Sequence, residues 1–148
     1  MTYEFRPVRS AAAWQHLHRI RRSVLFPPGR HSVDYDENHP DDRAEGNVPF
    51  LLMCCGHPIG VVRLDFRDET AVIRLVAVTD DERGKGHGRE LDRLIESEAK
   101  RREVRWLQVN AVPEAVGYYE KTGWRHGQWD TSELAGIAED CVQLSKEL

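Results

Sequence analysis

The chain has 148 residues and a formal net charge of −4, with 40 % hydrophobic and 31 % charged residues. This length suits one domain with a real core, and the composition lacks the signature of disorder. No apolar run is long enough to span a bilayer, and the first residues lack the apolar core of a signal peptide. The negative charge argues against a broad nucleic-acid surface, and the three cysteines show no zinc-binding spacing. We therefore expect a single cytoplasmic domain over residues 1–148, with no membrane, nucleic-acid or metal partner.

The N-terminal part of the chain predicts one strand, one helix and a long loop. Residues 2–8 have the pattern of a strand, and Ser10 can cap a helix whose apolar residues follow helical spacing up to Val24. The Pro-Pro-Gly run at residues 27–29 ends this helix. A polar stretch follows over residues 30–47, and loops of this length are usually functional or disordered.

The rest of the chain alternates strand and helix patterns. Apolar, β-branched segments predict three strands joined by tight turns, and a helical apolar stripe follows the third. The predicted elements are strands at residues 49–55, 59–66 and 71–78, a helix at 86–101, a strand at 104–109, a short helix after Pro113, a strand beginning at Trp124 and a final strand at 141–144.

The junction between the third of these strands and the helix is rich in glycine and basic residues. It contains Arg83, Gly84, Lys85, Gly86, His87, Gly88 and Arg89. Glycine lets backbone N–H groups approach a ligand closely, and a helix N-terminus adds free N–H groups and a positive dipole end. The pattern therefore predicts a pyrophosphate site. The alternative is a glycine-rich turn that only begins the helix.

Two common phosphate motifs do not fit this junction. A P-loop needs Ser or Thr after Gly-Lys, but Gly86 stands there. A dinucleotide fingerprint needs a third glycine where the chain has Arg89. With Arg83, Gly86 and Gly88 at the signature positions, the junction instead resembles the R-x-x-G-x-G loop of the GCN5-related N-acetyltransferase (GNAT) superfamily, which cradles the pyrophosphate of acetyl-coenzyme A.

A second segment, residues 110–124, is similar to the other GNAT signature. It has an Asn after a strand, then an aromatic-Tyr-Glu-Lys run, then Gly and an aromatic residue. The resemblance implies an α/β fold of the α+β kind. It consists of a mixed central sheet of six to seven strands that splays after the fourth strand, flanked by about four helices.

The resemblance also implies a set of roles. The enzyme would be an acetyl-CoA-dependent N-acetyltransferase, with acetyl-CoA as co-substrate and no metal. The backbone N–H of Val78 would stabilise the thioester oxygen, and Tyr119 would protonate the leaving thiol as general acid. Asn110 would bind the pantetheine arm or hold its own loop. The cofactor-binding residues would be Val76, Ala77, Val78, Arg83, Gly84, Lys85, Gly86, His87, Gly88, Arg89, Asn110 and Tyr119.

The general base and the acceptor stay open at this point. Candidate bases are Asp36, Glu37, His39, Asp65, Glu139 and Asp140, and none is assigned. The polar loop also carries Asp34, Asp41, Asp42 and Glu45. If it lines the acceptor cleft, it would favour a cationic amine on a small molecule or a protein, and the alternative is a solvated acidic loop.

Two other functions and the oligomeric state also remain open. The chain could be an acyltransferase that uses a different acyl-CoA, such as succinyl-CoA. It could instead be a non-catalytic coenzyme A sensor, although a mere binder has no need of the Tyr119 phenol at the sulfur. Monomer and homodimer are both compatible with the sequence.

Overall fold

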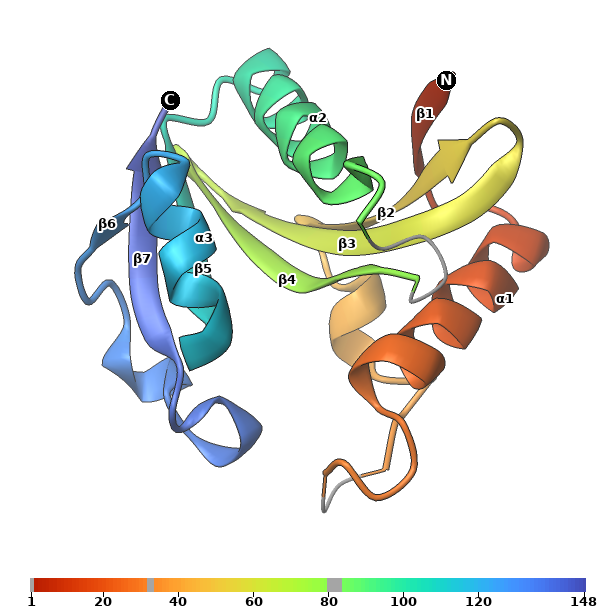
Figure 1. The fold of residues 1–148 in the computed structure, drawn as a ribbon, viewed down its shortest axis with the longest axis horizontal. Helices are drawn as coiled ribbons and strands as arrows, with labels where there is room; N and C mark the ends of the chain where they lie inside the picture. The colour runs from red at the N-terminus through yellow and green to blue at the C-terminus, as the bar shows by residue number, and fades with distance from the viewer. Residues whose placement is uncertain (1, 32–33, 80–83) are drawn as a thin grey trace.

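The computed structural model describes residues 2–31, 34–79 and 84–148 (Figure 1). Within these ranges the chain forms a seven-stranded sheet in the order β1-β2-β3-β4-β5-β7-β6. Neighbouring strands are antiparallel, except that β4 and β5 are parallel. The predicted mixed sheet is thereby confirmed. The strands are β1 (Tyr3–Pro7), β2 (Asn47–Cys54), β3 (His57–Arg67), β4 (Thr70–Val78), β5 (Trp106–Ala111), β6 (Arg125–His126) and β7 (Val142–Glu147).

Three α-helices lie in the described ranges, where about four were expected. They are α1 (Ala11–Ile20), α2 (His87–Arg101) and α3 (Val116–Lys121). The polar loop has no apolar stripe at helical spacing, so its only regular structure among the described residues is the short 3₁₀ turn η2 (Pro40–Arg43). Further short turns are η1 (Arg21–Leu25), a π-helical extension of α1, and the 3₁₀ turns η4 (Pro113–Ala115), η5 (Thr131–Glu133) and η6 (Gly136–Ala138).

The helix α1 begins as the sequence predicts. The Ser10 hydroxyl accepts a hydrogen bond from the Ala13 N–H at 3.1 Å, which satisfies one of the free donors of the first turn. Leu17, Ile20 and Val24 are buried on one face, as their helical spacing requires. None of the described helices is long and apolar enough to cross a membrane.

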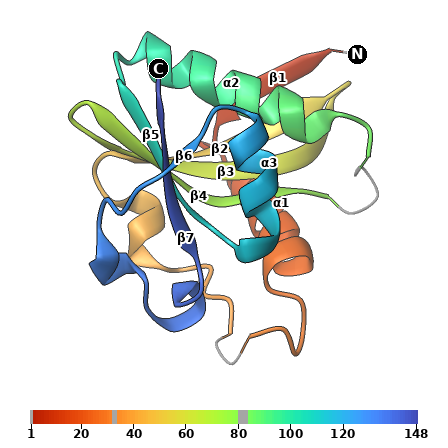
Figure 2. The same cartoon turned by 60° about the vertical axis from the view of Figure 1, so that its left-hand side comes forward.

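The sheet separates two hydrophobic clusters, with α1 on one face and α2 on the other (Figures 1 and 2). Leu17 and Ile20 of α1 pack with Val61 and Ala77 on one side. The apolar stripe of α2 and the buried Tyr119 of α3 pack on the opposite side, in the larger cluster. Alternation along β3 produces this division, because successive side chains of a strand point to opposite faces.

The sheet splits between β4 and β5, as the resemblance implies. These two strands pair only where Thr70–Ile73 of β4 lies beside Trp106–Val109 of β5. Beyond that point β4 stays with β3, and β5 stays with β7. A bulge contributes to the divergence, because Leu75 has a left-handed φ of 51° and the register between β3 and β4 shifts there.

Several predicted boundaries differ from the structure. The turn between β2 and β3 lies at Cys55 and Gly56, and His57 already belongs to β3. The strand predicted from Trp124 is only two residues long, Arg125–His126, because the chain then leaves the sheet for the turns η5 and η6. The strand predicted at 104–109 runs from Trp106 to Ala111.

Candidate active site

The glycine junction forms a left-handed turn directly before α2. Gly84 has φ 79° and Gly86 has φ 84°, a conformation that costs side-chain-bearing residues energy. Gly86 is the N-cap of α2 and offers no side-chain cap, so the first-turn N–H groups remain available to a ligand. The predicted contribution of Arg83 lies outside the described residues.

The space beside this turn is open. A Cβ atom built on Gly84, Gly86 or Gly88 would meet no heavy atom within 4 Å. Lys85 and Arg89 are exposed at the same helix end. Open space, backbone donors, a helix dipole and basic side chains are all features that favour the binding of an anion.

The imidazole of His87 has a different position from the rest of the junction. His87 is only 2 % exposed, and its Nδ1 lies 2.7 Å from the hydroxyl of Tyr3 on β1. The side chain therefore anchors the start of α2 to the sheet. Any contribution of His87 to an anion site comes from its backbone N–H.

The end of β4 presents backbone donors to the split. Thr79 donates its N–H to the carbonyl of Ile59 on β3 at 2.9 Å. Because successive N–H groups of a strand point to opposite edges, the N–H of Val78 points away from β3, toward the edge that β5 has left. The edge of β4 that faces the split thus carries the backbone polar groups expected there.

Tyr119 lies on α3 with its ring in the larger hydrophobic cluster. It is 9 % exposed and packs edge-on against Trp124 at 5.2 Å between ring centroids. Burial, followed by the charge of Asp92, raises the pKa of Tyr119 to about 12. Its hydroxyl has no hydrogen-bond partner among the described residues and is protonated at neutral pH. Tyr118 is more exposed and donates a hydrogen bond to Asp92 of α2.

Asn110 is held by protein groups on both sides of its amide. Its Nδ2 donates to Oε1 of Glu133 at 3.0 Å, and its Oδ1 accepts from Nε2 of Gln143 at 2.9 Å. Gln143 in turn binds the backbone of Trp129 and Asp130. In this arrangement Asn110 holds the loop between β6 and β7.

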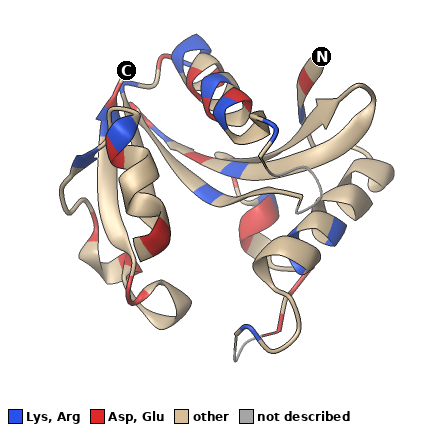
Figure 3. Cartoon of the chain, viewed as in Figure 1, with Lys and Arg blue, Asp and Glu red and all other residues tan. Residues whose placement is uncertain are grey.

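On the α1 side of the sheet, a pocket of about 340 Å³ lies next to the bulge in β4. Acidic side chains of the polar loop border it, together with arginines of β3, β4 and η1. Figure 3 shows where acidic and basic positions lie along the ribbon. Apolar walls come from η6, from the bulge and from the segment after η1. The lining residues are Arg21, Phe26, Asp34, Tyr35, Asp36, His39, Asp41, Asp42, Arg63, Arg74, Leu75 and Ile137.

The acidic residues of the polar loop fall into different environments. Asp42 is buried and paired with Arg21 at 2.8 Å and with Arg63 at 3.2 Å. Glu37 is paired with Arg22 at 2.5 Å, outside the pocket beside Leu75. Burial opposes the charge of Asp42, but hydrogen bonds and charge from Arg21 and then Arg63 outweigh it, so the pKa of Asp42 lies below its usual range.

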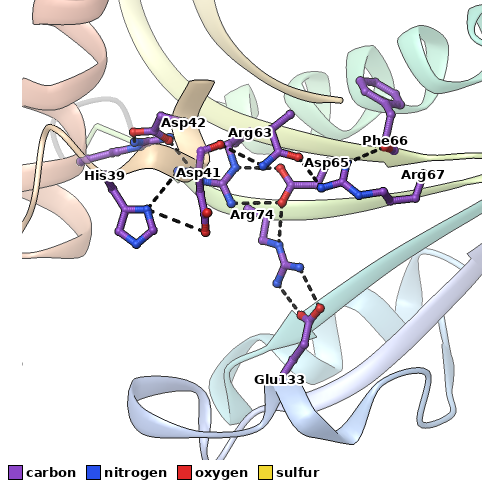
Figure 4. A network of polar contacts seen from close by, with 11 residues as sticks. His39, Asp41, Asp42, Arg63, Asp65, Phe66, Arg67, Arg74 and Glu133 are labelled. Carbon is purple, nitrogen blue, oxygen red and sulfur yellow. Dashed lines mark hydrogen bonds and ion pairs between the residues drawn. The ribbon is translucent and has the colours of Figure 1, made fainter. Parts of the chain in front are cut away.

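Asp65, a candidate base in the sequence, is also committed to ion pairs. Arg63 donates to both of its oxygens at 2.7 and 3.0 Å, and Arg74 donates to Oδ2 at 3.1 Å (Figure 4). A carboxylate held in this way has no free oxygen directed at a substrate. Glu139 and Asp140 are exposed residues before β7.

Comparison with known proteins decides the family. The family model described as acetyltransferase (GNAT) domain matches residues 37–138. The chain belongs to the GNAT acetyltransferase family. It is therefore an N-acetyltransferase of the acyltransferase class, and the family uses acetyl-CoA. No curated protein sequence matches the chain.

Solved structures share the fold of this GNAT protein over its full length. A Lactobacillus plantarum protein assigned as an N-acetyltransferase is 22 % identical, with TM-score 0.78 and coverage of 100 % of this chain and 99 % of its own. The ribosomal-protein-S18-alanine N-acetyltransferase of Escherichia coli is 16 % identical, with TM-score 0.76 and coverage of 99 % and 94 %. The PaiA N-acetyltransferase of Thermoplasma acidophilum, solved with coenzyme A, is 14 % identical, with TM-score 0.76 and 100 % coverage of both chains. At these identities the similarity concerns the fold.

The polar network that crosses the α1 face of this GNAT sheet was not predicted from the sequence. It links Arg21, Asp42, Arg63, Asp65, Arg74, Glu133, Asn110 and Gln143. A signal existed, since Arg63 and Asp65 stand two residues apart in an otherwise apolar strand. That pattern places charges on one sheet face, but it does not reveal their partners.

Proposed function

We propose that this GNAT protein, as a single domain over residues 1–148, transfers the acetyl group of acetyl-CoA to a primary amine by direct attack on the thioester. The observation that carries the proposal is the split between β4 and β5. The glycine turn follows β4 in the chain, and the pocket beside Leu75 borders the same strand on the α1 side. In this proposal the acetyl group of the coenzyme A held at the glycine turn and the amine in the pocket meet across the split.

In this proposal the glycine turn holds the pyrophosphate of coenzyme A. Its donors are the backbone N–H groups from Gly84 to Arg89, assisted by the charges of Lys85, Arg89 and Arg83. The pantetheine arm lies along the backbone of residues 76–78, as an added strand lies along a sheet edge. Asn110 supports this cleft through the loop that it holds.

The chemistry needs an oxyanion donor and an acid. The N–H of Val78, on the edge of β4 that faces the split, can stabilise the negative charge that develops on the thioester oxygen. Tyr119 keeps its proton through neutral pH and gives it to the departing thiolate of coenzyme A. Asp36 and His39 border the acceptor pocket, and neither is assigned as the base.

We propose a cationic amine as the acceptor. Asp34 and Asp36 border the pocket and have no Lys or Arg partner within the described ranges. Carboxylates lining a pocket raise the local concentration of cations. Phe26 and Ile137 add apolar walls, and Ile137 is 57 % exposed although its side chain is apolar. An amine with an apolar portion therefore fits this pocket better than a fully polar one.

The test is an acetyl-transfer assay with a panel of amines matched in size. Wild-type protein should release coenzyme A thiol faster with cationic than with neutral acceptors, and faster with acetyl-CoA than with succinyl-CoA. Replacing Asp34 and Asp36 by Asn should raise KM for the cationic amine by about three- to tenfold, since exposed charge pairs are each worth up to about 1 kcal/mol.

The controls separate the competing functions. Glu45→Gln removes an exposed charge of the same loop outside the pocket and should leave the amine KM unchanged. Added salt should mimic the double variant. Tight coenzyme A binding without transfer to any amine would indicate a sensor, and an unchanged amine KM in the double variant would refute the cationic acceptor.

A further inference from the structure

The end of the β4–β5 ladder marks a particular point in the split sheet. Ile73 and Val109 are the last paired residues of these strands. The next residue of β4 is Arg74, and the next residue of β5 is Asn110. These two residues lie on opposite sides of the opening, at its narrow end. The backbone pairing of β4 with β5 does not extend to them.

One carboxylate spans this opening. Glu133, the last residue of η5, accepts hydrogen bonds from Nη1 and Nη2 of Arg74 at 2.5 and 2.9 Å. Its Oε1 also accepts from Nδ2 of Asn110 at 3.0 Å. Figure 4 shows the side chain of Glu133 pointing toward Arg74 from the loop between β6 and β7. We call this arrangement of Arg74, Glu133 and Asn110 the Glu133 bridge.

Each end of the Glu133 bridge is fixed by further contacts. Arg74 is oriented by Asp65 at 3.1 Å, and Asp65 is locked by Arg63. Asn110 is oriented by Gln143, which is 4 % exposed. These contacts orient the guanidinium of Arg74 and the amide of Asn110, so both groups are directed at Glu133 across the opening.

The Glu133 bridge also positions the loop between β6 and β7, which borders the proposed acceptor pocket. Glu133 precedes η6, whose Ile137 borders the pocket beside Leu75. The side chain of Asp130 accepts from the Ser132 N–H at 3.1 Å and shapes the turn that presents Glu133. Through the bridge, one carboxylate ties both halves of the sheet to the wall of the acceptor pocket.

We propose that Glu133 is a positioning residue for acetyl transfer, an inference that rests on the proposed function. It holds the acceptor wall against the split so that the amine approaches the carbonyl carbon of the thioester from a fixed direction. It does not act as a base, because Arg74 occupies both of its oxygens. The role requires the length of the side chain and acceptors for three hydrogen bonds, two at Oε1 and one at Oε2. A small misplacement of reacting groups can cost about 10²-fold in rate.

Three substitutions separate this role from acid–base chemistry. Glu133→Gln keeps the length and a carbonyl oxygen that can accept from both Nη1 of Arg74 and Nδ2 of Asn110, and it loses only the oxygen that accepts from Nη2 of Arg74. Glu133→Asp keeps the charge but is one methylene too short to span both partners. Glu133→Ala removes the bridge. Gln128→Ala is the control, since Gln128 is an exposed polar side chain of the same loop.

We expect kcat within about threefold of wild type for Glu133→Gln, and a fall of about ten- to 100-fold for the Asp and Ala variants. The KM for acetyl-CoA and the pH profile should stay unchanged in all of them. Amide hydrogen exchange of residues 127–141 should accelerate in the Asp and Ala variants but not in Gln, and this readout needs no turnover.

Two results would overturn the inference. If Gln is as damaging as Ala and the pH profile loses its acidic limb, Glu133 is a base. If exchange in residues 127–141 and kcat are the same in all variants, the bridge is an ordinary ion pair. A wild-type protein that acetylates no amine would contradict the proposed function instead, and hydrogen exchange would still report on the bridge.

Discussion

Replacing Gly88 by alanine should stabilise the free protein and weaken its binding of coenzyme A. Gly88 lies in the first turn of α2, is not among the residues with positive φ, and has no heavy atom within 4 Å of the position that a Cβ would take. Gly84 and Gly86 are less suitable, because their left-handed φ angles would strain any other residue. The substitution Gly88→Ala can therefore change the affinity for coenzyme A without straining the backbone of the folded protein.

The two expected effects have opposite signs. Alanine is favoured over glycine in a helix by up to about 1 kcal/mol, which corresponds to a rise in Tm of about 1–4 °C for a chain of this size. A methyl group in the open space would displace a phosphate from the helix N-terminus. Losing one charge-assisted hydrogen bond costs about 1.5–3 kcal/mol, or about ten- to 150-fold in Kd.

Calorimetric titration with coenzyme A and thermal unfolding of the free protein measure the two effects. Gly127→Ala is the matched control, because its Cβ also meets no atom within 4 Å and it lies beyond β6, away from the glycine turn. An unchanged Kd in Gly88→Ala, with Tm raised, would show that the turn begins the helix without holding a pyrophosphate.

Substitutions at Tyr119 and Asp42 test the proposed general acid and the buried ion pairs. Tyr119→Phe should lower kcat by about 10²-fold with coenzyme A affinity unchanged, and wild-type turnover would make the phenol structural. Because the folded pKa of Tyr119 is raised to about 12, its contribution to stability is present below pH about 10 and is lost as pH rises toward 12. The free energy of unfolding of Tyr119→Phe should therefore fall less steeply than that of wild type as pH rises from about 10 to about 12. Asp42→Ala leaves Arg21 and Arg63 as buried charges without their shared partner, and urea unfolding should show a loss of about 3–5 kcal/mol. Since the pKa of Asp42 is lowered, wild type should lose this stabilisation only as pH falls below the usual carboxyl range. An Asp42→Ala variant as stable as wild type would contradict the buried pairing.

The elements around the glycine turn could be predicted because local patterns determine them. The apolar run of β4, the glycines and the stripe of α2 adjoin one another in sequence, and each follows a short-range rule. The split of the sheet after the fourth strand could be predicted only from the family resemblance. The position of His87 could not be predicted in the same way, since its contact with Tyr3 joins residues 84 positions apart.

The polar network lies beyond local patterns for a physical reason. Asp65 looks like a hairpin carboxylate in the sequence, but it lies on the same face of β3 as Arg63, and the register of β3 and β4 adds Arg74 beside it. Glu133 meets Arg74 across 59 positions of sequence. The sequence of the polar loop shows its acidic residues only as a cluster of charges. Folding buries Asp42, pairs Glu37 with Arg22 and leaves Asp36 beside the pocket.

The most direct test of the account is a reaction with acetyl-CoA labelled in the acetyl group and one cationic primary amine. Coenzyme A thiol and labelled N-acetyl product are quantified together, and the protein is checked for label by mass spectrometry. Direct attack in the split predicts equal amounts of thiol and acetylated amine, with no label on the protein. Thiol release without acetylated amine, or a labelled protein intermediate that decays into product, would contradict it.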